Sequence, residues 1–141
     1  MGAEVDLIVR SMCSLRPGVP GLSERIRVRS IVGRFLEHSR IFSFGRGEDA
    51  ELYLGSSDLM PRNLDRRVEV VVPVTDSLLS ARLQSILDVC LADDVLAWEL
   101  SADGSWSKVP TVVGLNSHRR FQELALDRAR SNGAASRVTH G

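Results

Sequence analysis

The sequence predicts an α/β fold in which helices flank a mixed β-sheet. Short apolar runs rich in β-branched residues, at Val5–Val9 and Val68–Val72, are typical of buried strands. Apolar residues also recur at helical spacing over Asp76–Leu91. Two further apolar runs flank a glycine-containing turn, as in a hairpin. The length of 141 residues suits one domain, which we place at residues 1–130.

The first third of the chain predicts two strands joined by a loop. Val5–Val9 is expected to be a strand buried on both faces, with Arg10 at its carboxyl end. Proline and glycine residues make Ser14–Ser23 a loop. Ile26–Ile31 alternates apolar residues with arginine, which predicts a short strand with one basic face. Ile31–Glu37 is expected to form one or two helical turns.

The middle of the chain predicts a hairpin followed by a short helix. The hairpin arms are Arg40–Phe44 and Glu51–Leu54, and the glycines between them supply turn dihedral angles. Pro61–Asp65 is expected to be a short helix with its proline in the first turn. Ser57 or Asp58 would cap that helix.

The remaining elements are a strand at Val68–Val72 ended by Pro73, a helix at Asp76–Leu91, edge strands at Val95–Leu100 and Ser107–Val113, and a terminal helix at Ser117–Ala129. Asp76 or Ser77 can cap the first of these helices. Its predicted inner face carries Leu79, Leu83, Ile86, Leu87 and Cys90. Phe121, Leu124 and Ala125 would face inward on the second. Residues 131–141 are small and polar, and we expect a disordered tail there.

Composition narrows the possible environments and partners. No apolar run approaches the ~20 residues that a membrane-spanning helix needs, and no signal sequence opens the chain. We therefore expect a cytoplasmic protein without a transmembrane segment. Cys13 and Cys90 match no metal-binding spacing and are expected to be reduced thiols. Aromatic residues make up only 5% and do not alternate with basic ones, which argues against a nucleic-acid partner.

Arginine dominates the positive charge. Of 18 basic residues only Lys108 is a lysine, so 17 are arginines. Between Arg10 and Arg46 the chain carries eight arginines against two acids, a local charge of +6 that attracts anions. The planar guanidinium offers two parallel donors to phosphate oxygens. There is no P-loop, no dinucleotide-binding fingerprint and no metal-ligand cluster in the sequence.

His38 is the principal catalytic candidate, because it lies in this arginine-rich stretch with Arg34 before it and Arg40 after it. A histidine can donate to a phosphate oxygen, move a proton or accept a phosphoryl group. A purely structural histidine, either capping or buried, is the alternative.

A second group of candidates follows the hairpin. Gly55-Ser56-Ser57-Asp58 could bind an anion through backbone N–H groups at a helix N-terminus, or could be an ordinary cap and turn. The candidates for phosphate contacts are Arg40, Ser57, Arg62, Asn63, Arg66 and Arg67. The arginines among them could instead pair with Asp58, Asp65 and Glu69, and Arg25, Arg27 and Arg29 could form only a solvated face.

The same residues carry a family resemblance. Two blocks between about Leu7 and Val70 resemble the C-terminal domain of the long bacterial polyphosphate kinases, LIVRSMCSLRPGVPGLSERIRVRSIVGRFLEHSRIF and LYLGSSDLMPRNLDRRVEV. The resemblance implies a fold similar to one phospholipase D-like half. It implies an enzyme that transfers the terminal phosphate of ATP reversibly to polyphosphate through a phosphohistidine. In the family pattern Arg10 and His38 match nucleotide contacts.

The resemblance also implies what these residues do not contain. The phosphorylated histidine and the Mg²⁺ contacts of the family belong to the preceding part of the enzyme. We therefore expect a domain incomplete at its N-terminus, inactive in isolation, from an enzyme that acts on ATP, ADP and polyphosphate as a homo-oligomer. Two alternatives are a phospholipase D-like phosphodiesterase half-site and a non-catalytic polyanion-binding module. The His-x-Arg spacing at His38, in place of His-x-Lys, counts against the phosphodiesterase.

Overall fold

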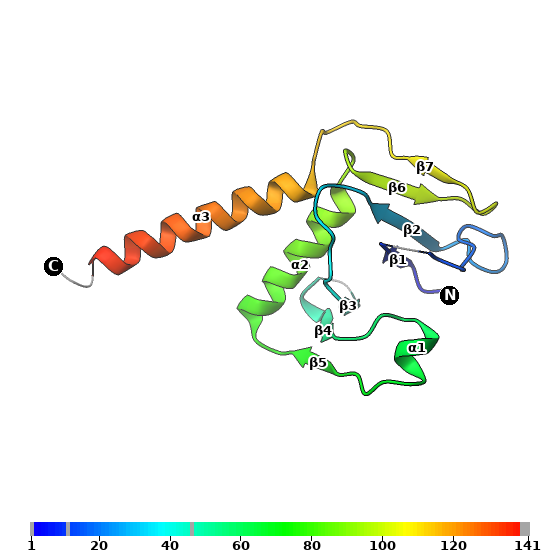
Figure 1. The fold of residues 1–141 in the computed structure, drawn as a ribbon, viewed down its shortest axis with the longest axis horizontal. Helices are drawn as coiled ribbons and strands as arrows, with labels where there is room; N and C mark the ends of the chain where they lie inside the picture. Colours follow the sequence, from blue (N-terminus) through cyan, green and yellow to red (C-terminus); the bar gives the residue numbers. More distant parts are fainter. Residues whose placement is uncertain (1, 11, 46, 139–141) are drawn as a thin grey trace. The chain divides into compact units, whose positions relative to one another are not determined.

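The computed structural model describes residues 2–10, 12–45 and 47–138 and contains a β-sheet in each of two units (Figure 1). One unit comprises Met1–Leu36 and Cys90–Gly141, and the other comprises Glu37–Val89. Strands and helices are both present, so the predicted α/β class is confirmed. The second sheet was not predicted. The sequence predicted one mixed sheet, which was expected to include the hairpin and the strand at Val68–Val72.

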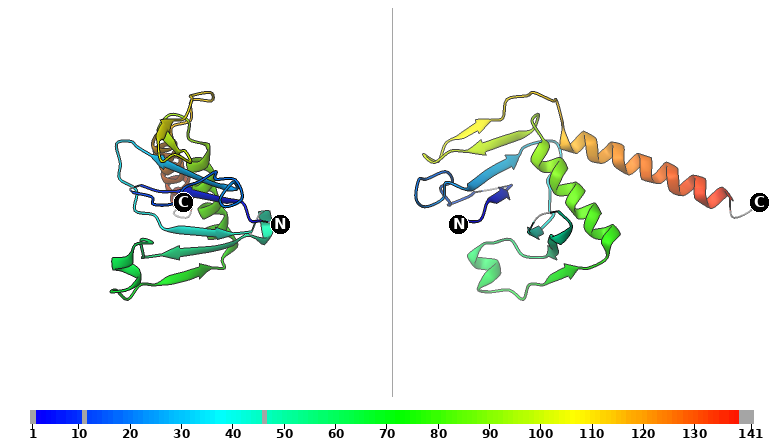
Figure 2. Two further views of the ribbon diagram at one scale, coloured as in Figure 1. Left: turned by 90° about the vertical axis from the view of Figure 1, so that its right-hand side faces the viewer. Right: turned by 180° about the vertical axis from the view of Figure 1, so that it is seen from behind.

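The sheet of the first unit has four strands in the order β1-β2-β6-β7 (Figures 1 and 2). The strands are β1 (Val5–Ile8), β2 (Ile26–Ile31), β6 (Ala97–Leu100) and β7 (Trp106–Lys108). β1 is parallel to β2 and the other two pairings are antiparallel, so the predicted mixed sheet is confirmed. Val28 and Ala97 are its most buried apolar residues.

Two predictions about this sheet are wrong. β1 lies at an edge and alternates between half-buried and exposed residues, so it is not buried on both faces. Asp6 explains the exposed face, since its carboxylate accepts hydrogen bonds of 2.7 and 3.0 Å from Arg27 on β2. β6 lies inside the sheet, between β2 and β7, whereas both C-terminal strands were expected at edges.

The segment after β2 contains no helix, contrary to the prediction for Ile31–Glu37. Gly33 passes closely beside the ring of His118, and a Cβ built there would lie 2.7 Å from the imidazole and 2.8 Å from Leu96. The Phe35 N–H donates to His118 Nδ1 at 3.4 Å. This contact with a distant part of the chain, rather than local propensity, sets the backbone path.

Two adjacent buried carboxylates tie the C-terminal elements of this unit together. Asp94 accepts hydrogen bonds from four consecutive N–H groups, those of residues 112–115, at 2.6–3.1 Å. Asp93 accepts from Val95, Leu96 and Ser117 at 2.6–2.9 Å. The backbone N–H groups lower the pKa of Asp94 from 3.8 to about 2, although burial opposes this shift.

The terminal helix α3 (Ser117–Val138) is longer than expected. It begins at the predicted residue, where Asn116 Oδ1 accepts from the Arg119 N–H at 3.0 Å. It then continues through residues 131–138, where the sequence predicts disorder, and residues 139–141 lie outside the described part. Adding residues to an existing helix costs far less than starting one, which favours this continuation.

The second unit contains a three-stranded antiparallel sheet in the order β3-β4-β5. Its strands are β3 (Ile41–Phe44), β4 (Glu51–Gly55) and β5 (Val71–Val74). β3 and β4 form the predicted hairpin, with Gly45 and Gly47 at positive φ and a short 3₁₀ turn, η1 (Gly47–Asp49), between them. β5 starts later than expected and includes Pro73, which an edge strand tolerates.

Two helices lie where they were predicted in this part of the chain, although Leu79, which was expected on the inner face of the second, is 54% exposed. α1 (Pro61–Leu64) is a single turn that opens with its proline. α2 (Ser77–Ala92) begins in the second unit, and Asp76 caps it by accepting from the N–H groups of Leu78 and Leu79 at 3.0 and 2.9 Å. No helix among the described residues combines the length and the apolar character needed to cross a bilayer.

The close approach at Gly33 predicts that Gly33→Ala destabilises the first unit by about 1–3 kcal/mol, the usual cost of overpacking. Urea unfolding followed by tryptophan fluorescence measures this unit, because both tryptophans lie in it. Gly2→Ala is the control, since its Cβ would meet only the Arg25 side chain at an ordinary 3.6 Å. Equal unfolding midpoints for the two variants would contradict the close approach.

The carboxylate of Asp94 predicts an acid-dependent contribution to stability. Because its folded pKa of about 2 lies below the ordinary 3.8, the contribution is complete above about pH 4 and is lost as the pH falls toward 2. Asp94→Asn should unfold at a lower temperature than the native chain at pH 7, and this difference should shrink between pH 4 and 2. Asp103→Asn, in an exposed turn, should cost less. A difference that stays constant with pH would argue against an ionised Asp94.

Candidate functional site

The predicted site residues fall into both units. Arg10 lies in the first unit, separated from β1 by Val9, near the carboxyl end of that strand as predicted. The other predicted residues lie in the second unit: His38, Arg40, Ser57, Arg62, Asn63, Arg66 and Arg67. The sequence also led us to expect His38 at the carboxyl end of a strand, and this is wrong because His38 precedes β3.

The β3–β4 hairpin brings Arg40 and Asp58 together. The Gly55 N–H donates to the Arg40 carbonyl at 2.8 Å, which extends the ladder by one step beyond β3. Gly55 is needed there, since a Cβ would lie 2.9 Å from the Phe42 ring. The Arg40 guanidinium then donates to Asp58 Oδ1 through Nε at 3.1 Å and Nη2 at 3.0 Å. Its Nη1 donates to the His38 carbonyl at 2.8 Å.

Ser57 and Asp58 do not cap α1, which corrects the prediction. Met60 is the N-cap residue, and no side chain caps the helix. The Asp58 carboxylate is engaged by Arg40 instead, and the buried Ser57 hydroxyl donates to the Asp58 carbonyl at 2.8 Å. The backbone N–H groups of Asn63 and Leu64 donate to the Met60 carbonyl. Because these two N–H groups are occupied and α1 is a single turn, the helix start gives little support to an anion site, and backbone binding by residues 55–58 stays a prediction.

Glu69 organises the segment that returns from α1. Its carboxylate accepts from the Ser56 hydroxyl and, at 3.0 Å, from Asn63 Nδ2. The Val70 N–H donates to Ser56 Oγ at 3.1 Å and closes the loop. The hydrogen bonds from Ser56 and Asn63 lower the pKa of Glu69, with Arg67 and Arg40 adding electrostatic attraction. The sequence placed Ser56 in a candidate anion-binding segment and Glu69 among the acids that could pair with arginines, but it did not predict their contact with each other or with Asn63.

The NH₂ group of the Asn63 side chain therefore has a structural role. It is 4% exposed, and its Nδ2 is committed to Glu69. Its Oδ1 is buried and meets no hydrogen-bond partner among the described residues. The sequence left open whether this amide orients a turn or a phosphate, and the observed contact favours the turn.

Arg62 lies in α1, and Arg66 and Arg67 follow it closely; these three residues, called the α1 arginines below, are all exposed. The described residues give Arg62 and Arg66 neither a hydrogen bond nor an ion pair. Of the three local acids that could have paired with them, Asp58 binds Arg40 and Glu69 binds Ser56 and Asn63. These cations therefore face solvent with little local neutralisation.

The arginines of β2 behave differently. Arg27 pairs with Asp6, and Arg29 donates to Glu99 at 2.8 Å and to the Leu91 carbonyl. Arg25 donates to the Gly2 carbonyl at 3.0 Å. These three arginines of the predicted +6 stretch thus make contacts within the first unit. The basic face of β2 is therefore neither purely solvated nor fully available to an anion.

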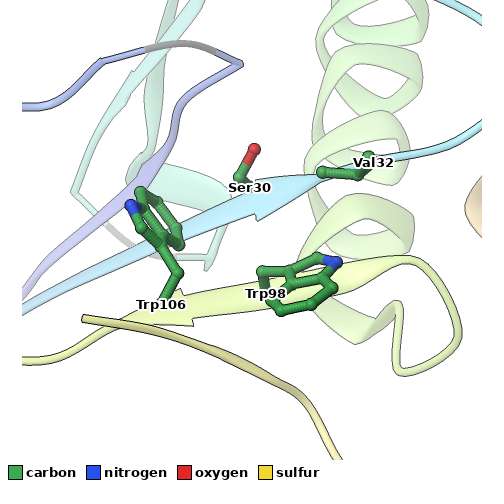
Figure 3. A pocket seen from close by; sticks show the side chains of 4 residues that line it. All are labelled: Ser30, Val32, Trp98 and Trp106. Carbon is green, nitrogen blue, oxygen red and sulfur yellow. The ribbon is translucent and has the colours of Figure 1, made fainter.

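A pocket of about 290 Å³ lies on the first unit, apart from the predicted site residues. Figure 3 shows its lining: Trp98 from β6, Trp106 from β7, and Ser30 and Val32 from β2 and the residue after it. Both indoles are about one-third exposed, and the Lys108 ammonium lies 5.6 Å from the Trp98 ring. No predicted site residue lines this pocket.

Metal-binding chemistry finds little support in the described residues. They contain no group of three or more histidine, cysteine or acidic side chains placed to hold a metal ion. The carboxylates of Asp58 and Glu69 are already engaged by Arg40, Ser56 and Asn63. The described residues therefore do not fit a Mg²⁺ ion, and the resemblance places its contacts in the preceding part of the enzyme.

Comparisons with known proteins agree with one another. Residues 1–120 match the family model "Polyphosphate kinase C-terminal domain 2". The chain is 50% identical over 136 residues to the polyphosphate kinase of Streptomyces coelicolor, covering 96% of this chain and 18% of that protein. It is 46% identical over 138 residues to polyphosphate kinase 1 of Chlorobaculum tepidum, covering 97% of this chain and 20% of that protein.

A solved structure gives the same result for the fold. The chain is similar to the polyphosphate kinase of Porphyromonas gingivalis with a TM-score of 0.84 and 32% identity. The match covers 91% of this chain and 20% of that one. The chain therefore spans about a fifth of the length of these relatives.

Proposed function

The chain belongs to the polyphosphate kinase family, which it matches through C-terminal domain 2, and from this membership we propose that it handles nucleotide and polyphosphate. The enzyme would transfer the terminal phosphate of ATP reversibly to inorganic polyphosphate. The family match over residues 1–120 is the observation that carries this proposal. The exposed α1 arginines supply the chemistry that a polyanion requires.

The α1 arginines are the proposed polyphosphate contacts. A polyphosphate carries repeated negative charge, and exposed guanidinium groups bind it by Coulomb attraction and paired hydrogen bonds. Phosphoryl transfer depends mainly on positioning and on stabilising the charge that spreads over the transferred group. Three neighbouring guanidinium groups would serve both purposes. Three other candidates make internal hydrogen bonds, and they would hold the segment that carries these arginines rather than bind phosphate directly: Arg40, Ser57 and Asn63.

Arg10 and His38 are the proposed nucleotide contacts. Arg10 would hold phosphate oxygens of ATP, and His38 would donate to the nucleotide or move a proton during transfer. Two observations support these roles. Both side chains are exposed, and Arg10 lies near the carboxyl end of a parallel strand, where ligands commonly bind. The phosphohistidine of the reaction would be carried elsewhere in the enzyme.

The remaining features of the enzyme follow from the family alone. We propose ATP, ADP and polyphosphate as substrates, Mg²⁺ held by other parts of the enzyme, a homo-oligomeric assembly and a cytoplasmic location.

Polyphosphate affinity should depend on the α1 arginines and on salt. Replacing Arg62, Arg66 and Arg67 together with glutamine should weaken tripolyphosphate binding by roughly tenfold or more at low salt, and salt should weaken native binding steadily. Calorimetry at several salt concentrations measures both effects. The control replaces Arg16, Arg82 and Arg128, three exposed arginines elsewhere. Equal losses in the two triple variants would mean that only net charge matters.

His38 and Arg10 should matter for ATP and not for folding. His38→Ala should reduce ATP affinity by about tenfold while changing the free energy of unfolding by less than about 0.5 kcal/mol, as expected of an exposed side chain. Arg10→Lys should also weaken ATP binding, because lysine lacks the paired donors. Arg16→Lys is its control. A His38→Ala chain that binds ATP normally but melts early would instead make His38 structural.

A further inference from the structure

We propose that Asp58 is a positioning residue for His38 and acts through Arg40. The structure joins the three in sequence: the Asp58 carboxylate holds the Arg40 guanidinium, which in turn holds the His38 carbonyl. The proposal rests on the function proposed above for His38, and it gives Asp58 a role that the nucleotide and phosphate contacts do not include.

The hairpin makes this arrangement specific. The Gly55 N–H bonds to the Arg40 carbonyl, so Arg40 stands opposite the end of β4. Asp58 follows Gly55 by three residues, and the Ser57 hydroxyl fixes the intervening turn by donating to the Asp58 carbonyl. Strand register, rather than chance contact between flexible side chains, therefore brings the carboxylate to the guanidinium.

The geometry of the guanidinium lets one side chain serve both neighbours. Arg40 presents Nε and Nη2 to a single oxygen of Asp58 at 3.1 and 3.0 Å. The remaining terminal nitrogen, Nη1, reaches the His38 carbonyl at 2.8 Å. Because the guanidinium is planar and rigid, fixing one side of it fixes the direction of the other. Lysine, with one nitrogen, could not replace both contacts in the same way.

Partial burial strengthens the ion pair between Arg40 and Asp58. The Arg40 and Asp58 side chains are only 25% and 27% exposed, so solvent screens their attraction less than that of a surface pair. By contrast, His38 lies on a segment without regular structure between Val32 and Arg40. Held at its carbonyl, His38 keeps one backbone orientation while its imidazole remains exposed. Preorganisation of this kind lowers the entropic cost of binding a ligand.

The test compares the native chain with Asp58→Asn, Asp58→Glu and Arg40→Lys. Backbone NMR signals of His38 and Ser39 report the hydrogen bond to the His38 carbonyl without ligand, and ATP titration reports its consequence. His118, buried in the other unit, provides an internal reference. Asp65→Asn is the matched control, because it removes the same charge from an exposed acid whose side chain makes no contact with Arg40 among the described residues.

We expect Asp58→Asn and Arg40→Lys to shift the His38 and Ser39 signals in the same direction and to weaken ATP binding about tenfold. The double variant should add little, since both changes break one chain of contacts. Asp58→Glu, which keeps the charge, should recover part of the affinity. Asp65→Asn should resemble the native chain in both measurements.

Two other results would overturn the proposal in distinguishable ways. If Asp58→Asn leaves the His38 signals or the ATP affinity unchanged while the native His38 signals respond to ATP, the positioning role alone fails. If ATP does not move the native His38 signals, the nucleotide role of His38 fails, and the positioning role fails with it.

Discussion

The first unit depends on two adjacent carboxylates, Asp93 and Asp94, which accept hydrogen bonds from separate sets of backbone N–H groups. Asp93 and Asp94 follow α2 directly, and together they accept hydrogen bonds from the two residues before β6, from residues 112–115 and from the first residue of α3. This unit has few buried apolar side chains, since Val28, Ala97 and Pro17 are the only buried apolar residues among its described residues. Hydrogen bonds to these two carboxylates therefore provide much of the stabilisation that a large apolar core provides in other domains.

Elements with strong local patterns could be predicted from the sequence. The alternation at Ile26–Ile31 and the cap at Asp76 match the observed strand and helix start, because each depends on neighbouring residues. Predictions failed where a distant partner decides the outcome. Gly33 follows a path set by His118, and Asp58 leaves the helix that it was expected to cap because Arg40 holds it. Neither partnership has a local sequence signal.

The candidate site shows the same division at the level of single arginines. The sequence identifies an arginine-rich stretch, but it cannot say which acids these arginines meet. Arg27 and Arg29 find Asp6 and Glu99, which lie 21 and 70 residues away. For Arg62 and Arg66 the nearby acids were available in sequence, yet Arg40, Ser56 and Asn63 engage two of them. Arg62 and Arg66 thus remain without an ion pair after the hairpin, outside the stretch with the largest formal charge.

This distribution separates two tasks that one arginine cannot perform together. A guanidinium that holds a half-buried carboxylate and a carbonyl has its donors directed inward, so it orders the backbone but offers little to a ligand. An exposed guanidinium offers its donors to phosphate but cannot order the chain that carries it. The hairpin end contains both kinds, with Arg40 ordered by Asp58 and the α1 arginines exposed on a segment that Glu69 anchors. Since phosphoryl transfer depends on fixed geometry and concentrated positive charge, the proposed transfer to polyphosphate would need the inward arginine as much as the outward ones.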